Sequence, residues 1–222
     1  MTRDLRFGRR GPAAGEVKSL VVFLHGYGAD GADLLGLADP LGPHLPHTAF
    51  VAPDAPERCA GNPFGYQWFP IPWLDGSSEA AAQAGMLAAM ADLNGFLDAR
   101  LSEEGLTAAD LALVGFSQGT MMALAVAPRR PAPCACVVGF SGRLIAPERL
   151  KDEIVSRPPV LLVHGDADQL IPVEALFQAA QGLSALDLPV EFHISAGIGH
   201  GIDQEGLRHG AEFLARRLAH HR

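Results

Sequence analysis

Six short apolar runs, separated by stretches of helical character, constrain the fold of this chain more than any other feature. They carry few polar residues, as strands buried on both faces of a sheet do. The runs are 20–24, 48–52, 111–116, 136–140, 160–163 and 190–194. Helical patterns lie between or after them at 78–101, 173–180 and 207–218. Strands that alternate with helices predict an α/β fold with a mostly parallel, twisted sheet and helices on both faces.

Length and composition indicate one ordinary globular domain. The chain has 222 residues, of which 48% are apolar and 19% are charged, so it can bury a substantial core. Because no internal repeat or long linker divides it, we expect a single domain over residues 1–222. Residues 1–16 mix arginine, glycine and proline, and we expect them to form a flexible N-terminal segment.

Charge and cysteine usage exclude several classes of function. The formal net charge of −8 opposes binding to nucleic acid or to anionic membranes, since both require a basic surface. No stretch has the length of a membrane span or the pattern of a signal peptide. The three cysteines lack the paired spacing of a zinc site. We therefore expect a cytoplasmic protein that uses neither a metal nor an organic cofactor.

The strongest chemical signal is a Gly-x-Ser-x-Gly motif at 115–119, with Ser117 at its centre. The motif ends the predicted strand 111–116 and begins a helical stretch, 118–127, which is the setting of a nucleophile elbow. Such a turn strains the backbone of the serine, and the flanking glycines avoid collision with neighbouring backbone. Ser117 is therefore the predicted nucleophile. The alternative is a glycine-rich turn that carries a surface serine.

A serine nucleophile needs a base that accepts its proton and a third group that orients the base. On this kind of fold the acid and then the histidine follow the serine, each in the loop after a later strand. His200 follows the last predicted strand and is the predicted base; a surface histidine is the alternative. Two aspartates follow strand 160–163. We expect Asp168 to be the acid because it lies further from the turn, whereas Asp166 can cap its own backbone.

The remaining histidines occupy positions that suit structural roles better. His25 and His164 stand at strand ends in His-Gly turns, where hydrogen bonding to backbone is the expected role. His193 lies inside the strand 190–194 rather than in the loop after it.

Acyl transfer also requires two preorganised N–H donors for the developing oxyanion. The residue after the nucleophile supplies the first, so the backbone N–H of Gln118 is one predicted donor. The second is expected in the loop after an early strand, which residues 24–28 form with the sequence LHGYG. Its glycines let substrate approach the backbone, and we expect the N–H of Tyr27 to be the second donor. An ordinary glycine turn is the alternative.

Taken together, these segments resemble the phospholipase/carboxylesterase family, which comprises small α/β-hydrolases without a separate lid domain. The resemblance is carried by FLHGYG at 23–28, APDAP at 52–56, WF at 68–69, GFSQG at 115–119, HGDAD at 164–168 with IP at 171–172, and GH at 199–200. It implies a catalytic triad of Ser117, Asp168 and His200. It also implies Tyr27 and Gln118 as the oxyanion donors.

The chain departs from the family at two positions. Thr120 stands where the family often has glycine or alanine, and Tyr27 stands where the thioesterases have an aliphatic residue. Both residues are expected beside the substrate pocket, so substrate preference does not transfer from the resemblance.

These observations predict a serine carboxylesterase that hydrolyses short- to medium-chain carboxylic esters through an acyl-enzyme intermediate. Activity of the acyl-protein thioesterase or lysophospholipase type is the alternative, because one triad serves both acyl–oxygen and acyl–sulfur bonds. A non-catalytic binding protein on the same fold is disfavoured, since all three triad positions are filled. The expected partner is a small-molecule ester, and the resemblance also implies pairing of the chain as a homodimer.

A long stretch without periodicity, 53–76, is the candidate for substrate selection. It contains five aromatic residues and follows a predicted strand, at the edge of the sheet where α/β folds bind ligands. We expect Phe64, Trp68, Phe69 and Trp73 to line a groove for the acyl chain. The alternative is that Trp68, Phe69 and Trp73 only anchor a long connection to the core.

Overall fold

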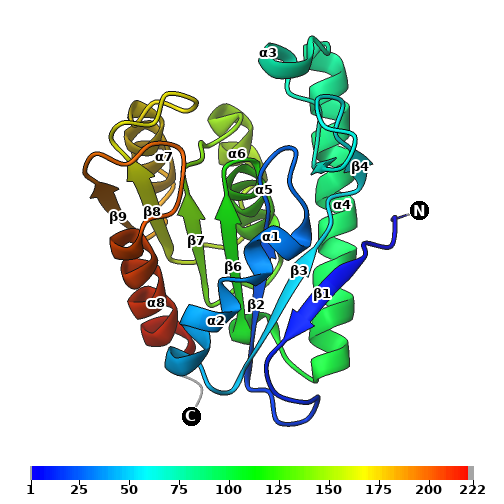
Figure 1. The fold of residues 1–222 in the computed structure, drawn as a ribbon, viewed down its shortest axis with the longest axis vertical. Helices are drawn as coiled ribbons and strands as arrows, with labels where there is room; N and C mark the ends of the chain where they lie inside the picture. Colours follow the sequence, from blue (N-terminus) through cyan, green and yellow to red (C-terminus); the bar gives the residue numbers. More distant parts are fainter. Residues whose placement is uncertain (1, 220–222) are drawn as a thin grey trace.

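The apolar runs form the strands of one seven-stranded sheet in the computed structural model, which describes residues 2–219. The strands are β1 (Phe7–Arg10), β2 (Ser19–Leu24), β3 (Thr48–Pro53), β6 (Leu111–Phe116), β7 (Cys136–Phe140), β8 (Val160–Gly165) and β9 (Val190–Ser195). They lie in the order β1-β3-β2-β6-β7-β8-β9, and all neighbours are parallel except β1 and β3. The predicted mostly parallel sheet is confirmed (Figure 1).

The helices that lie between and after the strands are α1 (Gly31–Leu35), α2 (Ala38–Leu41), α3 (Pro72–Asp75), α4 (Glu79–Glu104), α5 (Gln118–Val126), α6 (Pro147–Glu153), α7 (Glu174–Ser184) and α8 (Gln204–Leu218). The sequence predicted α4, α5, α7 and α8, with ends that differ by a few residues, whereas the four shorter helices were not predicted. Short 3₁₀ turns are η1 (Gly42–His44), η2 (Ala108–Asp110) and η3 (Ala127–Arg129). Within residues 2–219, no helix combines the length and the apolar character needed to cross a bilayer.

Successive side chains of a strand point to opposite faces of the sheet, and this alternation divides the core into two layers. On β2, Leu20, Val22 and Leu24 join the apolar cluster beneath α4, α5 and α7. Val21 and Phe23 join the cluster beneath α1, α2 and α8. All five side chains are buried. Helices therefore cover both faces of the sheet, as the apolar character of the strands predicted (Figure 1).

The N-terminal segment differs from the flexible tail expected for residues 1–16. Residues 7–10 form β1, which pairs antiparallel with β3 at the edge of the sheet. Arg3 donates hydrogen bonds of 2.7 Å from its backbone N and from Nε to the buried Asp92 of α4. Sequence patterning missed the strand because its four residues, FGRR, are mostly exposed and contain no apolar run.

The aperiodic stretch 53–76 contains more regular structure than the sequence indicated. Strands β4 (Glu57–Arg58) and β5 (Tyr66–Gln67) form a short antiparallel hairpin, and α3 follows it. In Figure 1, α3 stands beyond the carboxyl ends of the parallel strands. The segment therefore lies at the end of the sheet where the loops after β2, β6, β8 and β9 also emerge.

The long helix α4 offers a direct test of where the core lies. Leu97 is fully buried, whereas Leu87 of the same helix is 47% exposed. We predict that Leu97→Ala lowers the free energy of unfolding by about 2–5 kcal/mol, because it removes buried apolar contacts and leaves a cavity. The matched variant Leu87→Ala should lower it by about 1 kcal/mol or less. Urea denaturation measures both values, and equal losses would contradict this packing.

Candidate active site

Ser117 occupies the sharp turn between β6 and α5. Its backbone has φ 53° and ψ −114°, a strained conformation for a residue with a Cβ. A Cβ added to Gly115 would overlap the backbone nitrogen of Thr120, and one added to Gly119 would overlap the carbonyl oxygen of Leu24. The flanking glycines are therefore required by close backbone contacts, as expected of an elbow. Ser117 is 8% exposed, so it lies on the floor of the site.

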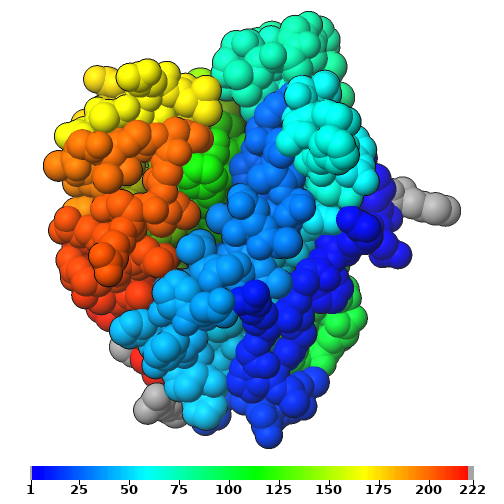
Figure 2. All heavy atoms as spheres, in the orientation of Figure 1, coloured from blue at the N-terminus to red at the C-terminus, as the bar shows by residue number. Residues whose placement is uncertain are grey.

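Figure 2 shows a hollow in the molecular surface over this part of the chain. Green atoms from the region of β6 and α5 lie at the bottom of a cleft. Orange atoms from the region of β9 and the segment after it flank one side, and blue atoms from the segment after β2 flank the other.

His200 and Asp168 meet across two neighbouring loops. His200 Nδ1 lies 2.7 Å from Asp168 Oδ2. The other carboxylate oxygen, Oδ1, accepts hydrogen bonds of 2.9 Å from the backbone N–H groups of Leu170 and Ile171. Burial raises the pKa of Asp168, but the hydrogen bonds from Ile171, His200 and Leu170 outweigh it and leave the pKa below its ordinary value. Asp168 is therefore a carboxylate at neutral pH.

The second candidate acid, Asp166, makes a different contact. Its Oδ1 accepts a hydrogen bond of 2.6 Å from the backbone N–H of Gly197, in the loop after β9. Asp166 thus reaches the next loop instead of capping its own backbone, which differs from the expectation. Asp168 does both, since Oδ1 caps its own loop and Oδ2 reaches His200. The carboxylate against His200 is nevertheless that of Asp168.

An aromatic contact places His200 beside the elbow. The rings of His200 and Phe116 have centroids 5.0 Å apart, and Phe116 is the residue before Ser117. Among the hydrogen bonds within residues 2–219, none joins Ser117 Oγ to His200. In enzymes that use such a pair, the hydrogen bond between nucleophile and base is often long without substrate and tightens when substrate binds. The sequence did not reveal this contact of Phe116, because an aromatic residue at the end of a buried strand is also typical of the hydrophobic core.

The loop after β2 approaches the elbow at Gly26. A Cβ added to Gly26 would lie 3.4 Å from the Cβ of Ser117 and 3.2 Å from the Phe116 ring, so glycine allows this approach. Two nearby backbone N–H groups, those of Tyr27 and Gln118, have no hydrogen-bond partner in the part of the chain that the structure describes. An oxyanion hole requires unpaired N–H donors of this kind near the nucleophile.

The two histidines expected to bind backbone do so. His25 Nε2 accepts a hydrogen bond of 2.9 Å from Ala55 N–H, so Nδ1 carries the proton and donates to Gly26 O at 2.7 Å. Burial lowers the pKa of His25, which keeps the ring neutral. His164 Nε2 lies 2.8 Å from the carbonyl oxygen of Ile171. His25 thus ties the loop after β2 to the segment after β3.

The side chain of Gln118 has a second role that sequence reasoning missed. Its Oε1 accepts a hydrogen bond of 2.9 Å from the Trp68 backbone N–H, and its Nε2 donates one of 2.7 Å to Phe69 O. Trp68 Nε1 donates to the carbonyl oxygen of His25 at 3.0 Å. Gln118 and Trp68 are fully buried. The motif could not reveal this clamp, because it identifies only the backbone N–H of Gln118.

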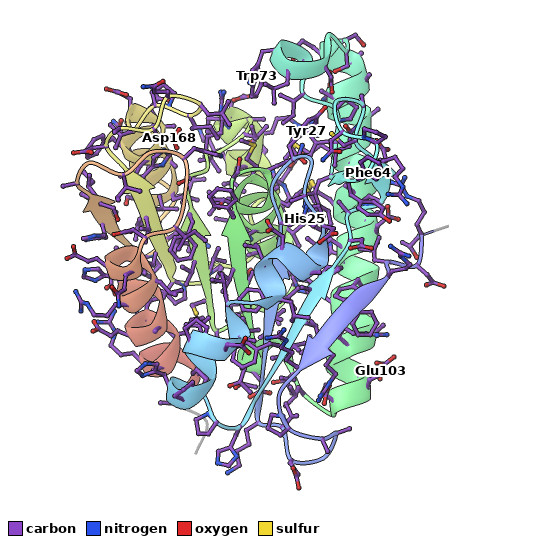
Figure 3. The ribbon with its side chains drawn as sticks, viewed as in Figure 1. His25, Tyr27, Phe64, Trp73, Glu103 and Asp168 are labelled. Carbon is purple, nitrogen blue, oxygen red and sulfur yellow. The ribbon has the colours of Figure 1, made fainter. Side chains whose placement is uncertain are left out.

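Two of the four aromatic residues expected to bind substrate line an apolar groove, and two do not. Phe69 and Trp73 line a groove of about 310 Å³ at α3, α4 and α6. Trp68 has no exposed surface and anchors the 53–76 segment to the core, which was the alternative expectation. Phe64 is 84% exposed and does not line the groove, because it sits at the tip of the β4–β5 hairpin. Figure 3 labels Trp73 and Phe64 at separate places.

Trp73 stands between the groove and the loop that carries Asp168. The guanidinium of Arg143 lies 5.5 Å from the centre of the Trp73 ring. Trp73 and Arg143 also line a second hollow of about 380 Å³ together with Leu170 and Ile171. Both hollows are therefore bordered by one exposed tryptophan near the proposed catalytic loops (Figure 3).

The residues at which the chain departs from the family lie in different settings. Thr120 is buried beneath the elbow, where its Oγ1 lies 2.9 Å from Gly115 O and 2.8 Å from Phe140 O. The expectation that it borders the pocket is corrected, because this hydroxyl satisfies strand-end carbonyls. Tyr27 donates a hydrogen bond of 3.4 Å to Asp75 Oδ2 at the end of α3. Burial raises the pKa of Tyr27, so its hydroxyl stays protonated.

Known proteins are similar to this chain in sequence and fold. The pattern of the phospholipase/carboxylesterase family matches residues 12–218. Acyl-protein thioesterase 1 of Yarrowia lipolytica is 32% identical over 175 residues, which cover 72% of this chain and 74% of that protein. Esterase YpfH of Escherichia coli is 26% identical over 204 residues, covering 92% and 85%. The crystal structure of esterase PE8 matches with a TM-score of 0.92 and 45% identity, over 97% of this chain and 100% of that one. The chain therefore belongs to the phospholipase/carboxylesterase family of α/β-hydrolases and is a serine hydrolase of carboxylic esters.

Proposed function

We propose that this protein hydrolyses short- to medium-chain carboxylic esters through a triad of Ser117, His200 and Asp168. The observation that carries the proposal is the 2.7 Å contact between His200 Nδ1 and Asp168 Oδ2 in loops beside the strained elbow of Ser117. An ionised, buried carboxylate at Nδ1 selects the tautomer with the proton on that nitrogen. The other nitrogen, Nε2, then has a lone pair with which it can accept the proton of the serine hydroxyl.

The proposed reaction follows the order that this geometry allows. Ser117 Oγ attacks the ester carbonyl while His200 Nε2 accepts its proton, and the imidazolium that forms is stabilised by Asp168. The N–H groups of Tyr27 and Gln118 bind the oxyanion. His200 then protonates the departing alcohol, which leaves an acyl group on Ser117. Water attacks the acyl-enzyme with His200 again as base, and the carboxylic acid is released.

The groove at α3 supports the proposed range of acyl chains. Its lining is mainly apolar and includes Phe69, Ile71 and Trp73. Phe69 is held close to the nucleophile because Gln118, the next residue after Ser117, binds its carbonyl oxygen. A groove of limited volume, about 310 Å³, favours chains that fill it and disfavours chains that exceed it.

Thioesters are the second candidate substrate class. The relative from Yarrowia lipolytica is an acyl-protein thioesterase by name, and it matches most of this chain. The proposed triad attacks an acyl–sulfur bond by the same steps. Matched ester and thioester substrates with one acyl chain separate the two classes, because only the leaving group differs between them.

The first test concerns the nucleophile. Ser117→Ala should lower kcat for ester hydrolysis by a factor on the order of 10⁶, because the residues of a catalytic triad act as a unit. Alanine adds no bulk at the elbow, so circular dichroism and urea denaturation should show a folded protein. Near-normal turnover by the folded variant would contradict the proposal.

The second test compares the two aspartates. In Asp168→Asn, the amide NH₂ would face His200 Nδ1 and favour the tautomer in which Nε2 carries the proton, so kcat should fall by a factor of about 10³ to 10⁴. Asp166→Asn is the matched control, since an amide oxygen can still accept from Gly197 N–H and activity should stay near that of the parent. Steady-state kinetics on folded proteins measures both. A larger loss in Asp166→Asn would assign the acid to Asp166.

The third test concerns the acyl groove. In the parent, kcat/KM should rise by about fourfold for each added methylene from acetyl to butyryl or hexanoyl esters, and then fall. Trp73→Ala should flatten this rise while acetyl ester hydrolysis changes little. Phe64→Ala is the control, because this side chain is 84% exposed outside the groove. If kcat/KM of Trp73→Ala depends on chain length as in the parent, the proposal is contradicted and α3 has only a structural role.

A further inference from the structure

Three potential metal ligands gather where β9 and α8 pack together, apart from the proposed catalytic residues. They are His193 of β9 and Glu205 and His209 of α8. One ligand atom of each lies within 4.8 Å of those of the other two. Glu205 and His209 are four residues apart, so they lie one turn apart on the same face of the helix. None of the three has a role in the ester hydrolysis proposed above.

The histidine pair is preorganised and incompletely satisfied. The ring centroids of His193 and His209 lie 4.1 Å apart, with 30° between the ring planes. His193 Nε2 is buried and has no hydrogen-bond partner within residues 2–219. A buried nitrogen without a partner is unfavourable, and an imidazole nitrogen is also a common metal ligand. A bound ion would satisfy this group.

Within residues 2–219, Arg208 is the one positively charged residue that makes an ion pair or hydrogen bond with the cluster. Arg208 Nη2 lies 3.3 Å from His209 Nε2 and 3.9 Å from Glu205 Oε1. The Arg208 side chain is 54% exposed and also pairs through Nη1 with Glu212 at 2.6 Å. It can therefore move toward Glu212 when a cation enters, while Glu205 supplies a negative charge to the site.

We propose that His193, Glu205 and His209 form a binding site for a divalent zinc ion. Two imidazoles and one carboxylate are a ligand set that suits zinc, whereas magnesium and calcium prefer oxygen ligands. Tetrahedral zinc with bonds of about 2.0–2.1 Å requires donors about 3.3 Å apart. Since the donors lie within 4.8 Å of one another, side-chain movements of about 1.5 Å close the site. Water would complete the coordination.

Such an ion would join the two elements that flank the proposed catalytic histidine. His200 lies in the segment between β9 and α8. One tie across this segment already exists, because Ser195 Oγ donates a hydrogen bond of 2.6 Å to Asp203 Oδ1. An ion held by His193 on the strand and by Glu205 and His209 on the helix adds a second. Its expected effect is on the stability of this unit, without a chemical role in hydrolysis.

The test uses the full chain after treatment with a chelator and its removal. Thermal unfolding is followed with and without zinc, and with magnesium in place of zinc, while calorimetry measures zinc binding. Free zinc at a hundredfold excess over Kd should raise Tm by about 5–10 °C in the parent. His193→Ala and His209→Ala should each lose most of this rise, and magnesium should have little effect.

Two control variants remove histidines elsewhere. His44→Ala removes an exposed histidine of η1. The double variant His220→Ala with His221→Ala removes an adjacent pair that lies outside the described residues. Both should keep the zinc-dependent rise in Tm. The proposal is overturned if the parent neither binds zinc nor gains stability, if His193→Ala and His209→Ala keep the full rise, or if magnesium acts as strongly as zinc.

Discussion

The close backbone contact between the elbow and the end of β2 is the constraint on which the site depends. The Cα of Gly119 approaches the carbonyl oxygen of Leu24 so closely that no side chain fits between them. This contact sets the start of α5 directly against the loop that carries Tyr27. Ser117 keeps its strained backbone conformation because the sheet and the helix around it hold it in place.

Buried hydrogen bonds connect this contact to the loops after β2 and β3, whose sequences have no regular pattern. Gln118 holds the backbone of Trp68 and Phe69, and the Trp68 indole binds the carbonyl oxygen of His25. His25 in turn accepts from Ala55 N–H. Each bond lies in the interior, where an unpaired partner is costly, so the set acts as one unit. The wall of the groove at α3 is thus supported by the same residues that surround Ser117.

The sequence predicted those parts of the molecule that follow from a regular apolar pattern or from a known motif. The central strands follow from apolar runs, and the elbow follows from the spacing of Gly115, Ser117 and Gly119. Three kinds of feature could not be predicted. β1 has too few apolar residues to signal a strand. The burial of Trp68 and the exposure of Phe64 depend on how the 53–76 segment folds, which its composition does not determine. The cluster of His193, Glu205 and His209 joins a strand to a helix, so no spacing along the chain identifies it.

We propose above all that Ser117 is the nucleophile and that the histidine beside the elbow activates it. Reaction with a fluorophosphonate, followed by mass spectrometry of the digested protein, tests this proposal most directly. We expect one phosphonyl group per chain, attached to Ser117, and protection by an ester substrate added in competition. We also expect much slower labelling in His200→Ala, because the hydroxyl then lacks its base. Labelling of a different residue, or equal labelling rates in the parent and in His200→Ala, would contradict it.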